Sequence, residues 1–387
     1  MLRSGPSPAQ SLAAIRRWLP FVAVAALLPA CSSTSDGTSD DGSDRAAMMA
    51  PSVGAFPLSD VLWGGPILRD ETISALHYAD EHLFVATGSG ALWSVSKDGL
   101  PRWNTRQLPE PPAFAPVSNG ETVAVLSKGD LYCFDRNTGA LRLKRRLPFA
   151  TSTAPALSTS TGYFPSWDND RVHAVDLTTG ALGWFFRARG PVTATPVVAG
   201  APPRQVLYVA SEDGAIAAVE AAPAEGTPGE EAWSSKANGA NRAGLATTAD
   251  GAILLVASED TFLYGIDRVS GVKRWAFGAE TPLRRSPHAV AGAVYLDTGL
   301  EFVSLDAADG SVRWRQKGSY RFLVRNGAET FALSGGNQVV VFNDATGEIL
   351  GRHDMSAYAF FATNTESDVL YAATRDGQIF ALGRKTL

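Results

Sequence analysis

The side chains with the most direct chemistry in this chain of 387 residues are its cysteines and histidines, and their placement indicates no reaction site. With only Cys31 and Cys133 present, neither a disulfide framework nor a cysteine-based metal cluster is predicted. Cys133 lies in the apolar segment LYCFD, where a buried structural thiol is expected. The histidines are scattered and are expected to be ordinary residues: His77, His82, His173, His288 and His353.

Aspartates recur four residues ahead of a glycine, a placement suited to turns. They are Asp135, Asp176, Asp267 and Asp306. An Asp that opens a tight turn accepts bonds from backbone N–H groups, and the Gly that closes it adopts a positive φ without a Cβ clash. Hard cations need several oxygens that converge at one point, which this spacing does not indicate. The aspartates are therefore predicted to form turns, and no metal site is predicted.

The glycines of these turns repeat with a period of about 40 residues, the size of one four-stranded propeller blade. The repeat glycines are Gly99, Gly139, Gly180, Gly229, Gly271, Gly310 and Gly347. Four positions further on stand Trp103, Leu143, Trp184, Trp233, Trp275, Trp314 and Gly351. The tryptophans are predicted to be structural and to pack between neighbouring blades.

Eight apolar hairpins, such as VLYVASEDGAIAAVE and ILLVASEDTFLYGID, precede or contain these turns. Strands rich in Thr, Ser and Ala precede several of them, as at 154–158 and 194–198, and small residues suit the crowded centre of a ring. We therefore predict an all-β fold over residues 56–387, an eight-bladed β-propeller of four-stranded antiparallel blades.

The ring is predicted to close without a disulfide. The sequence reaches Leu387 after the third strand of the eighth blade, and the unused segment DVLWGGPI at 60–67 carries Trp63 in the repeat position. Pairing this N-terminal strand into the last blade removes both open edges.

Arginines in or near the predicted inner strands of blades 5, 6 and 7 are candidates for an anion site in the central funnel: Arg242, Arg284 or Arg285, and Arg321. Convergent guanidinium groups favour an anion. Alternatively, each arginine pairs with a nearby carboxylate or lies in water at a strand end. The sequence leaves both arrangements open.

Residues 1–30 have the pattern of an export signal, with arginines ahead of a short apolar stretch. The segment that ends at Cys31 resembles a bacterial lipobox, although Pro29 stands where a small residue is usual. The resemblance implies a signal peptide, a lipid anchor on Cys31 and, because Ser32 follows, an outer-membrane lipoprotein with its propeller in the periplasm. A soluble secreted form cut nearby is the alternative.

Residues 31–55 are rich in Ser, Asp, Gly and Thr and are expected to form a disordered tether. The formal net charge of the chain is -5, and no cluster of basic residues stands out. Nucleic acid is therefore not an expected partner.

The segments FLYGIDRVSGVKRW (262–275), RVHAVDLTTGALGW (171–184) and EFVSLDAADGSVRW (301–314) resemble the PQQ-type, or quinoprotein-like, repeat. The resemblance extends from residue 56 onward and is specific for the propeller fold. Quinoprotein dehydrogenases of this kind are longer and bind Ca²⁺ beside a catalytic Asp, and some carry a vicinal cysteine pair. Because Cys133 is isolated and the placed aspartates belong to turns, no enzyme activity is expected, nor PQQ or Ca²⁺ as cofactors.

The lipobox, tether, blade number and length together resemble the BamB family of the outer-membrane β-barrel assembly machinery. This resemblance implies a non-catalytic scaffold that acts through protein-protein interaction, with a BamA-like barrel assembly protein as partner. The loop at 236–248, KANGANRAGLATT, lacks the Asp/Arg-rich character of the family's docking loop. A ligand-binding propeller of the envelope, or one that serves another complex, is the alternative.

Overall fold

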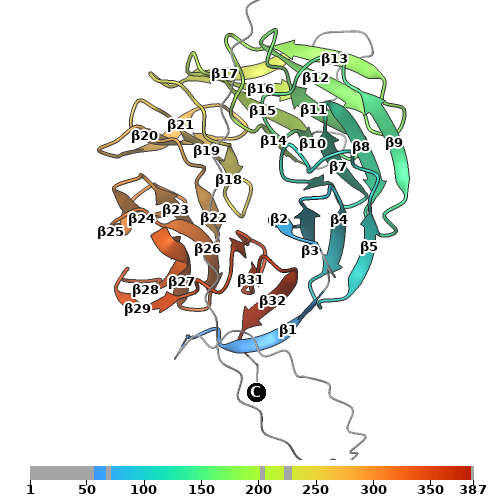
Figure 1. Ribbon diagram of the computed structural model, residues 1–387. Helices are drawn as coiled ribbons and strands as arrows, with labels where there is room; N and C mark the ends of the chain where they lie inside the picture. The colour runs from blue at the N-terminus through green and yellow to red at the C-terminus, as the bar shows by residue number, and fades with distance from the viewer. Residues whose placement is uncertain (1–55, 67–70, 201–204, 222–228, 385–387) are drawn as a thin grey trace, which may run out of the picture. The chain divides into compact units, whose positions relative to one another are not determined.

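The computed structural model describes residues 56–66, 71–200, 205–221 and 229–384, and these form a ring of eight four-stranded antiparallel sheets (Figure 1). The predicted all-β, eight-bladed propeller is confirmed. The signal peptide, Cys31 and the tether expected at 31–55 lie outside the described residues. Within the described part of the chain, no helix is both long and apolar enough to cross a membrane.

Blades 1 to 7 are meanders of four consecutive strands, and Figure 1 shows the first strand of a blade, such as β14 or β22, near the centre and the fourth outside. Blades 1 to 4 consist of β2 (Ile73–Ala79), β3 (His82–Thr87), β4 (Leu92–Ser96), β5 (Pro101–Thr105); β6 (Val117–Ser118), β7 (Thr122–Ser127), β8 (Asp130–Asp135), β9 (Leu141–Arg146); β10 (Ala156–Leu157), β11 (Thr161–Pro165), β12 (Arg171–Asp176), β13 (Leu182–Arg187); β14 (Val197–Ala199), β15 (Val206–Ala210), β16 (Ala215–Glu220), β17 (Glu231–Lys236).

Blades 5 to 7 follow the same order, and blade 7 also contains the 3-10 turn η1 (Gly335–Asn337). Blades 5 to 8 consist of β18 (Ala246–Thr247), β19 (Ile253–Ala257), β20 (Phe262–Asp267), β21 (Lys273–Gly278); β22 (His288–Val290), β23 (Ala293–Asp297), β24 (Glu301–Asp306), β25 (Val312–Lys317); β26 (Arg321–Asn326), β27 (Glu329–Ser334), β28 (Gln338–Asn343), β29 (Ile349–Asp354); β30 (Phe360–Phe361), β31 (Leu370–Ala373), β32 (Gln378–Gly383), β1 (Asp60–Pro66).

The turn between the third and fourth strands has the geometry that its Asp and Gly dictate. In blade 5, Asp267 Oδ1 accepts bonds from the backbone nitrogens of Ser270 (2.8 Å) and Val269 (3.0 Å), and Gly271 follows with φ 73°. Bonds from the Ser270 backbone and hydroxyl, and from Arg274, hold the pKa of Asp267 well below its ordinary value. The carboxylate is thus occupied by its own turn.

The outer-strand tryptophan of one blade lies against the turn glycine of the next blade. A Cβ atom added to Gly310 of blade 6 would stand 2.5 Å from Cε3 of Trp275 in blade 5. The indole Nε1 of Trp275 donates to the carbonyl of Ala307 in the same turn (3.3 Å). Equivalent tryptophan-glycine contacts join Trp63 to Gly99, Trp103 to Gly139, Trp184 to Gly229, Trp233 to Gly271 and Trp314 to Gly347, while Leu143 stands beside Gly180.

Replacing Gly310 by alanine should therefore destabilise the propeller by about 2 kcal/mol more than replacing Gly299, since only the first adds an overpacked contact. Both glycines lie in turns of blade 6 with positive φ (72° and 91°), but nothing stands within 4 Å of a Cβ at Gly299. Denaturant unfolding of the two variants measures the difference. Equal losses of stability would show that the Trp275 contact has no specific role.

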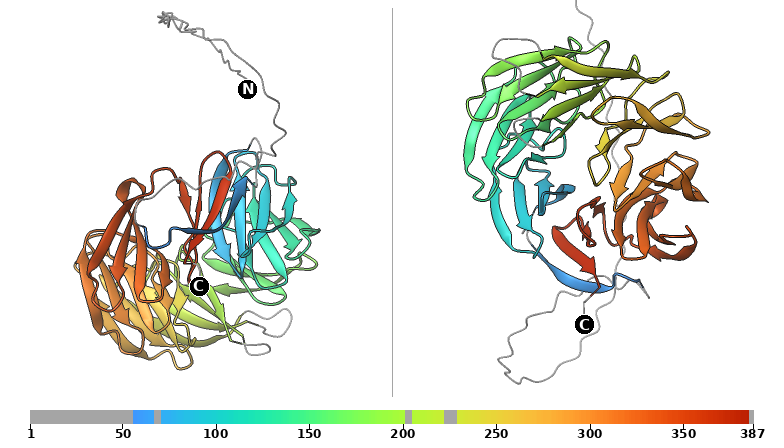
Figure 2. Two further views of the ribbon diagram at one scale, coloured as in Figure 1. Left: turned by 90° about the horizontal axis from the view of Figure 1, so that it is seen from below. Right: turned by 180° about the vertical axis from the view of Figure 1, so that it is seen from behind.

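The N-terminal strand completes the last blade, as predicted. β1 pairs antiparallel with β32 from Asp60↔Gly383 to Pro66↔Gln378, with Trp63 opposite Ala381 and an irregularity in register between Val61 and Trp63. Figures 1 and 2 show β1 beside β32 from both sides of the ring. Trp63 then donates from Nε1 to the carbonyl of Lys97 in blade 1 (2.6 Å).

The contact between blades 7 and 8 has a different construction. Blade 7 has Gly351 in the tryptophan position, and blade 8 has no turn between its third and fourth strands because they come from opposite ends of the propeller sequence. Phe56 fills this place, 2% exposed, with ring centroids 5.7 Å from Phe331 and 5.0 Å from His353. The segment ahead of β1 is therefore part of the core.

Candidate functional site

Two regions of the propeller contain the arginines singled out by the sequence. The first region, named here the charged belt, consists of Glu212, Arg242, Glu259 and Arg284. Arg242 Nη2 lies 2.9 Å from Glu212 Oε2 and its Nη1 lies 3.2 Å from Glu259 Oε1, which Arg284 Nε also contacts at 2.7 Å. The belt alternates in sign, so its charges are internally compensated.

The belt belongs to loops that meet at one rim of the ring. Glu212 and Glu259 lie in the turns between the second and third strands of blades 4 and 5, and the two arginines lie in the connections to blades 5 and 6. The hydrogen bond from Arg242 to Glu212 lowers the pKa of that carboxyl. Both arginine side chains remain about half exposed or more, at 47% for Arg242 and 69% for Arg284.

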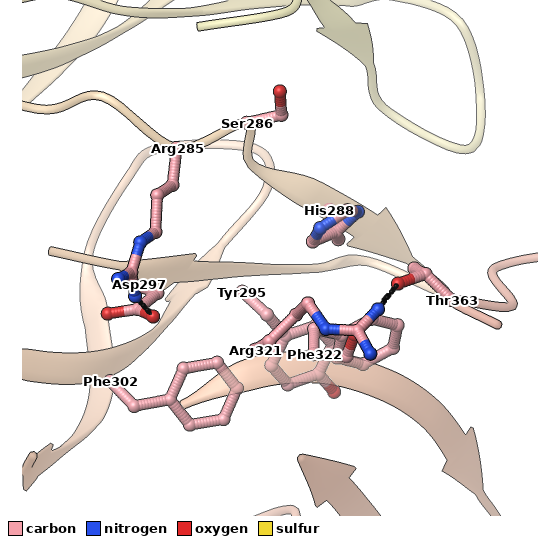
Figure 3. Close-up of a pocket in the computed structure, with 9 residues that line it drawn as sticks. All are labelled: Arg285, Ser286, His288, Tyr295, Asp297, Phe302, Arg321, Phe322 and Thr363. Carbon is pink, nitrogen blue, oxygen red and sulfur yellow. Dashed lines mark hydrogen bonds and ion pairs between the residues drawn. The ribbon is translucent and has the colours of Figure 1, made fainter. Parts of the chain in front are cut away.

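The second region is a pocket of about 420 Å³ among the inner strands of blades 6, 7 and 8 (Figure 3). It is lined by Arg285, Ser286, His288, Tyr295, Asp297, Phe302, Arg321, Phe322 and Thr363. The structure thus brings Arg285 and Arg321 to one cavity and places Arg242 in the charged belt.

Arg285 has a carboxylate partner in this pocket. Its Nη1 pairs with Oδ2 of Asp297, which is 6% exposed, and contacts the hydroxyl of Ser319 at 2.5 Å. Asp297 also accepts from Ser319 (3.0 Å) and from the backbone of Gly299 (2.8 Å). For Arg285, pairing with a nearby acid is therefore the arrangement observed.

Arg321 is held only by neutral acceptors. Both terminal nitrogens lie 3.3 Å from the carbonyl oxygen of Phe361 in β30, and Nη1 lies 3.4 Å from the hydroxyl of Thr363. Among the ion pairs of the described residues, none involves Arg321. Arg321 is exposed as a residue, but the inner strands beside it partly desolvate the guanidinium and lower its pKa.

His288 in β22 stands beside Arg321 in the same pocket (Figure 3). Burial, and then the positive charge of Arg321, lowers the pKa of His288 to about 4, so the ring is neutral near pH 7. The ring stacks on Phe322, with centroids 5.5 Å apart, and Phe322 stacks on Tyr295 at 4.8 Å. His288 therefore covers a buried aromatic cluster, since Phe322 and Tyr295 are 1% and 0% exposed.

Trp167 is a surface residue that the repeat pattern did not identify. It lies in the turn between β11 and β12 and is 66% exposed, whereas Trp275 and Trp314 are 8% and 5% exposed. The sequence does set Trp167 apart from the repeat tryptophans by its position. It stands in the middle of a hairpin and has no counterpart at the repeat positions.

The remaining chemical candidates lie in the core or in turns. Cys133 is fully buried, and this burial raises the pKa of its thiol to about 12. Over the described ranges, no group of three or more His, Cys, Asp or Glu side chains is placed to hold a metal ion.

Comparisons with known proteins agree with this architecture. No curated protein matches the chain, but many solved structures do. A crystal structure of BamB from Moraxella catarrhalis is similar with a TM-score of 0.66 at 17% identity, covering 85% of this chain and 98% of that chain. The computationally designed Ika8 protein is similar with a TM-score of 0.62 at 15% identity, covering 82% and 97%. At these identities the likeness shows the fold.

A family profile described as "Outer membrane protein assembly factor BamB" matches residues 60–161 and 224–332, which together make up more than half of the sequence. With eight PQQ-type blades and this match, the chain belongs to the BamB family of repeat propellers.

Proposed function

We propose that the protein is a non-catalytic scaffold lipoprotein of the cell envelope, which supports outer-membrane protein assembly by docking on a BamA-like barrel assembly protein. In this proposal Cys31 carries the lipid anchor and the propeller lies in the periplasm. The observation that carries the docking role is an exposed tryptophan on the same rim as the charged belt. Membership in the BamB family supports the choice of partner.

The exposed rim combines the residue types that dominate protein interfaces. Tryptophan and arginine are enriched among the residues that contribute most to binding, and charged groups at an interface favour specificity and fast association. Trp167 offers a large apolar surface, of which the described residues leave 66% exposed. The guanidinium groups of Arg242 and Arg284 are exposed. They can therefore replace their present carboxylate partners by groups of a docked protein without being drawn out of the core.

Backbone contacts connect Trp167 to the belt. Trp167 N donates to the carbonyl of Ala150 in the connection between blades 2 and 3 (2.8 Å). The adjoining Ser152 hydroxyl donates to Val192 O in the next connection, and Glu212 N donates to Pro191 O (2.9 Å). Trp167 and the charged belt therefore lie on hydrogen-bonded neighbouring loops, and the docking surface proposed here is continuous across blades 3 to 6.

We further propose that the protein works without PQQ or Ca²⁺. The turn aspartates support this proposal, because carboxylates such as Asp267 are already occupied by backbone donors and by Arg274. A quinoprotein dehydrogenase is the competing function. Dye reduction after addition of PQQ and Ca²⁺ to the purified protein would favour that enzyme instead.

Affinity purification from detergent-solubilised envelopes tests the docking surface. The unaltered protein should recover a large barrel protein, and Trp167→Ala or Arg242→Glu should reduce that recovery about tenfold, the loss expected for an interface residue of this kind. Matched controls lie at the opposite rim of blade 5: Arg274, at the start of β21, is as exposed as Arg242 (47%) and also pairs with an acid, and Val269, in the turn ahead of β21, is 83% exposed.

Arg274→Glu and Val269→Ala should leave the recovery unchanged. Equal recovery by all four variants would remove the proposed surface. Recovery of an unrelated complex by the unaltered protein would instead contradict the barrel-assembly partner.

A further inference from the structure

The pocket among blades 6, 7 and 8 contains one positive charge that no carboxylate of the described residues neutralises. Arg285 and Asp297 compensate one another, and His288 is neutral near pH 7. Within the described ranges, Arg321 donates to the carbonyl of Phe361 and the hydroxyl of Thr363, both of which are neutral. Hydrogen bonds from a guanidinium to a charged acceptor are about twice as strong as those to a neutral one, so an anion would be a better partner than either.

We propose that this pocket binds a small organic monocarboxylate, with its carboxylate on Arg321 and its apolar body beside the partly exposed ring of His288, behind which the rings of Phe322 and Tyr295 are buried. The volume of about 420 Å³ lies within the range of small-molecule sites. The inference goes beyond the scaffold role and stands independently of it, because the pocket shares no residue with the charged belt or with Trp167.

The charge and shape of the pocket distinguish between anions. A single uncompensated guanidinium balances one negative charge, and the carboxylate of Asp297 stands in the same cavity as a source of repulsion for a second (Figure 3). The partly exposed ring of His288, which is neutral near pH 7 and stacks on Phe322, offers a flat uncharged surface that inorganic phosphate would not use. These features favour an apolar monocarboxylate over phosphate.

Three probes separate charge from shape in the purified full-length protein. Phenylacetate has the proposed chemistry, 2-phenylethanol is a neutral analogue of similar size, and inorganic phosphate is an anion without an apolar body. Ligand-observed NMR at millimolar concentrations should show binding of phenylacetate at least about tenfold tighter than either of the others. Equal binding of phenylacetate and 2-phenylethanol, tighter binding of phosphate, or no binding of phenylacetate would each overturn the proposal.

Substitution of the guanidinium then locates the site. Arg321→Gln should weaken phenylacetate at least about tenfold, and Arg321→Lys should weaken it less because the charge remains. Arg242→Gln, which removes an equal charge from the belt, should bind as the unaltered protein does. Unchanged binding by folded Arg321→Gln would overturn the assignment, and the probe comparison on the unaltered protein decides the case if that variant does not fold.

Discussion

Deleting residues 56–66 is expected to abolish the cooperative unfolding transition of the propeller. The deletion removes β1 and its pairing with β32, and it also removes Phe56 and Leu58, which are 2% and 0% exposed in the core between blades 7 and 8. Burying a side chain of this size contributes about 1.5–3 kcal/mol, and an open propeller would also expose two unpaired edges. Circular dichroism during thermal unfolding measures the effect.

The matched control is a deletion of the same length, residues 35–45, from the segment expected to be a tether. This variant should keep the transition of the unaltered protein. A 56–66 deletion that unfolds at an unchanged temperature would show that the ring does not depend on its N-terminal strand.

Replacing Asp344 by asparagine is expected to destabilise the protein by about 3 kcal/mol, because it leaves two arginines at a blade junction without their shared counter-charge. Asp344 is 3% exposed, and its Oδ2 lies 2.8 Å from Arg325 and 3.2 Å from Arg313. Tyr295 and Thr330 donate hydroxyl hydrogen bonds to its Oδ1. This loss of stability lies at the low end of the range usual for broken buried ion pairs, because the side chains of Arg313 and Arg325 are 26% and 21% exposed.

The control is Asp135→Asn, which removes the carboxylate of an ion pair with the half-exposed Arg142. Exposed pairs contribute about 0–1 kcal/mol, and Asn343 shows that asparagine fits the equivalent turn. Denaturant unfolding compares the two variants. A loss at Asp344 no larger than at Asp135 would contradict the role of the buried junction.

Asp344 should also make the propeller sensitive to acid. Burial alone would raise its pKa, but the bonds from Tyr295 and Thr330 and the charges of Arg325 and Arg313 outweigh it and lower the pKa. A carboxyl whose pKa is lower in the folded state contributes stability above its unfolded pKa of about 3.9, and this stability is lost as the pH falls through the folded value. The unaltered protein should therefore lose more stability below about pH 4 than Asp344→Asn does.

The blade number and the ring closure were predictable because each contact behind them repeats with the period of the sequence. Gly310 and Trp275 belong to successive repeats, so the pattern that locates the turns also identifies the residues that meet between blades. Gly351 broke the pattern without an evident reason. Its explanation lies in Phe56, whose position in the core depends on the ends of the propeller sequence coming together.

The candidate site was less predictable because the partners of its charges lie in other hairpins. The sequence left it open whether Arg285 and Arg321 face a ligand or pair with acids. Asp297 reaches Arg285 only because β22 and β23 form a hairpin that ends near it, and no acid in the described part of the chain pairs with Arg321. The exposure of Trp167 likewise depends on how its turn projects from the rim, which hydrophobic periodicity does not encode.

The placement of Phe56 and β1 at the final blade has a consequence for how the chain matures. Among the described strands, β1 is made first but has no partner until β32 has been made. Until then the propeller is an open series of blades with apolar side chains exposed at both ends. A prematurely terminated product would keep residues such as Tyr78 and Leu323 uncovered and accessible to chaperones and proteases. Completion of the ring thus buries apolar surfaces that an unfinished propeller would leave open to solvent.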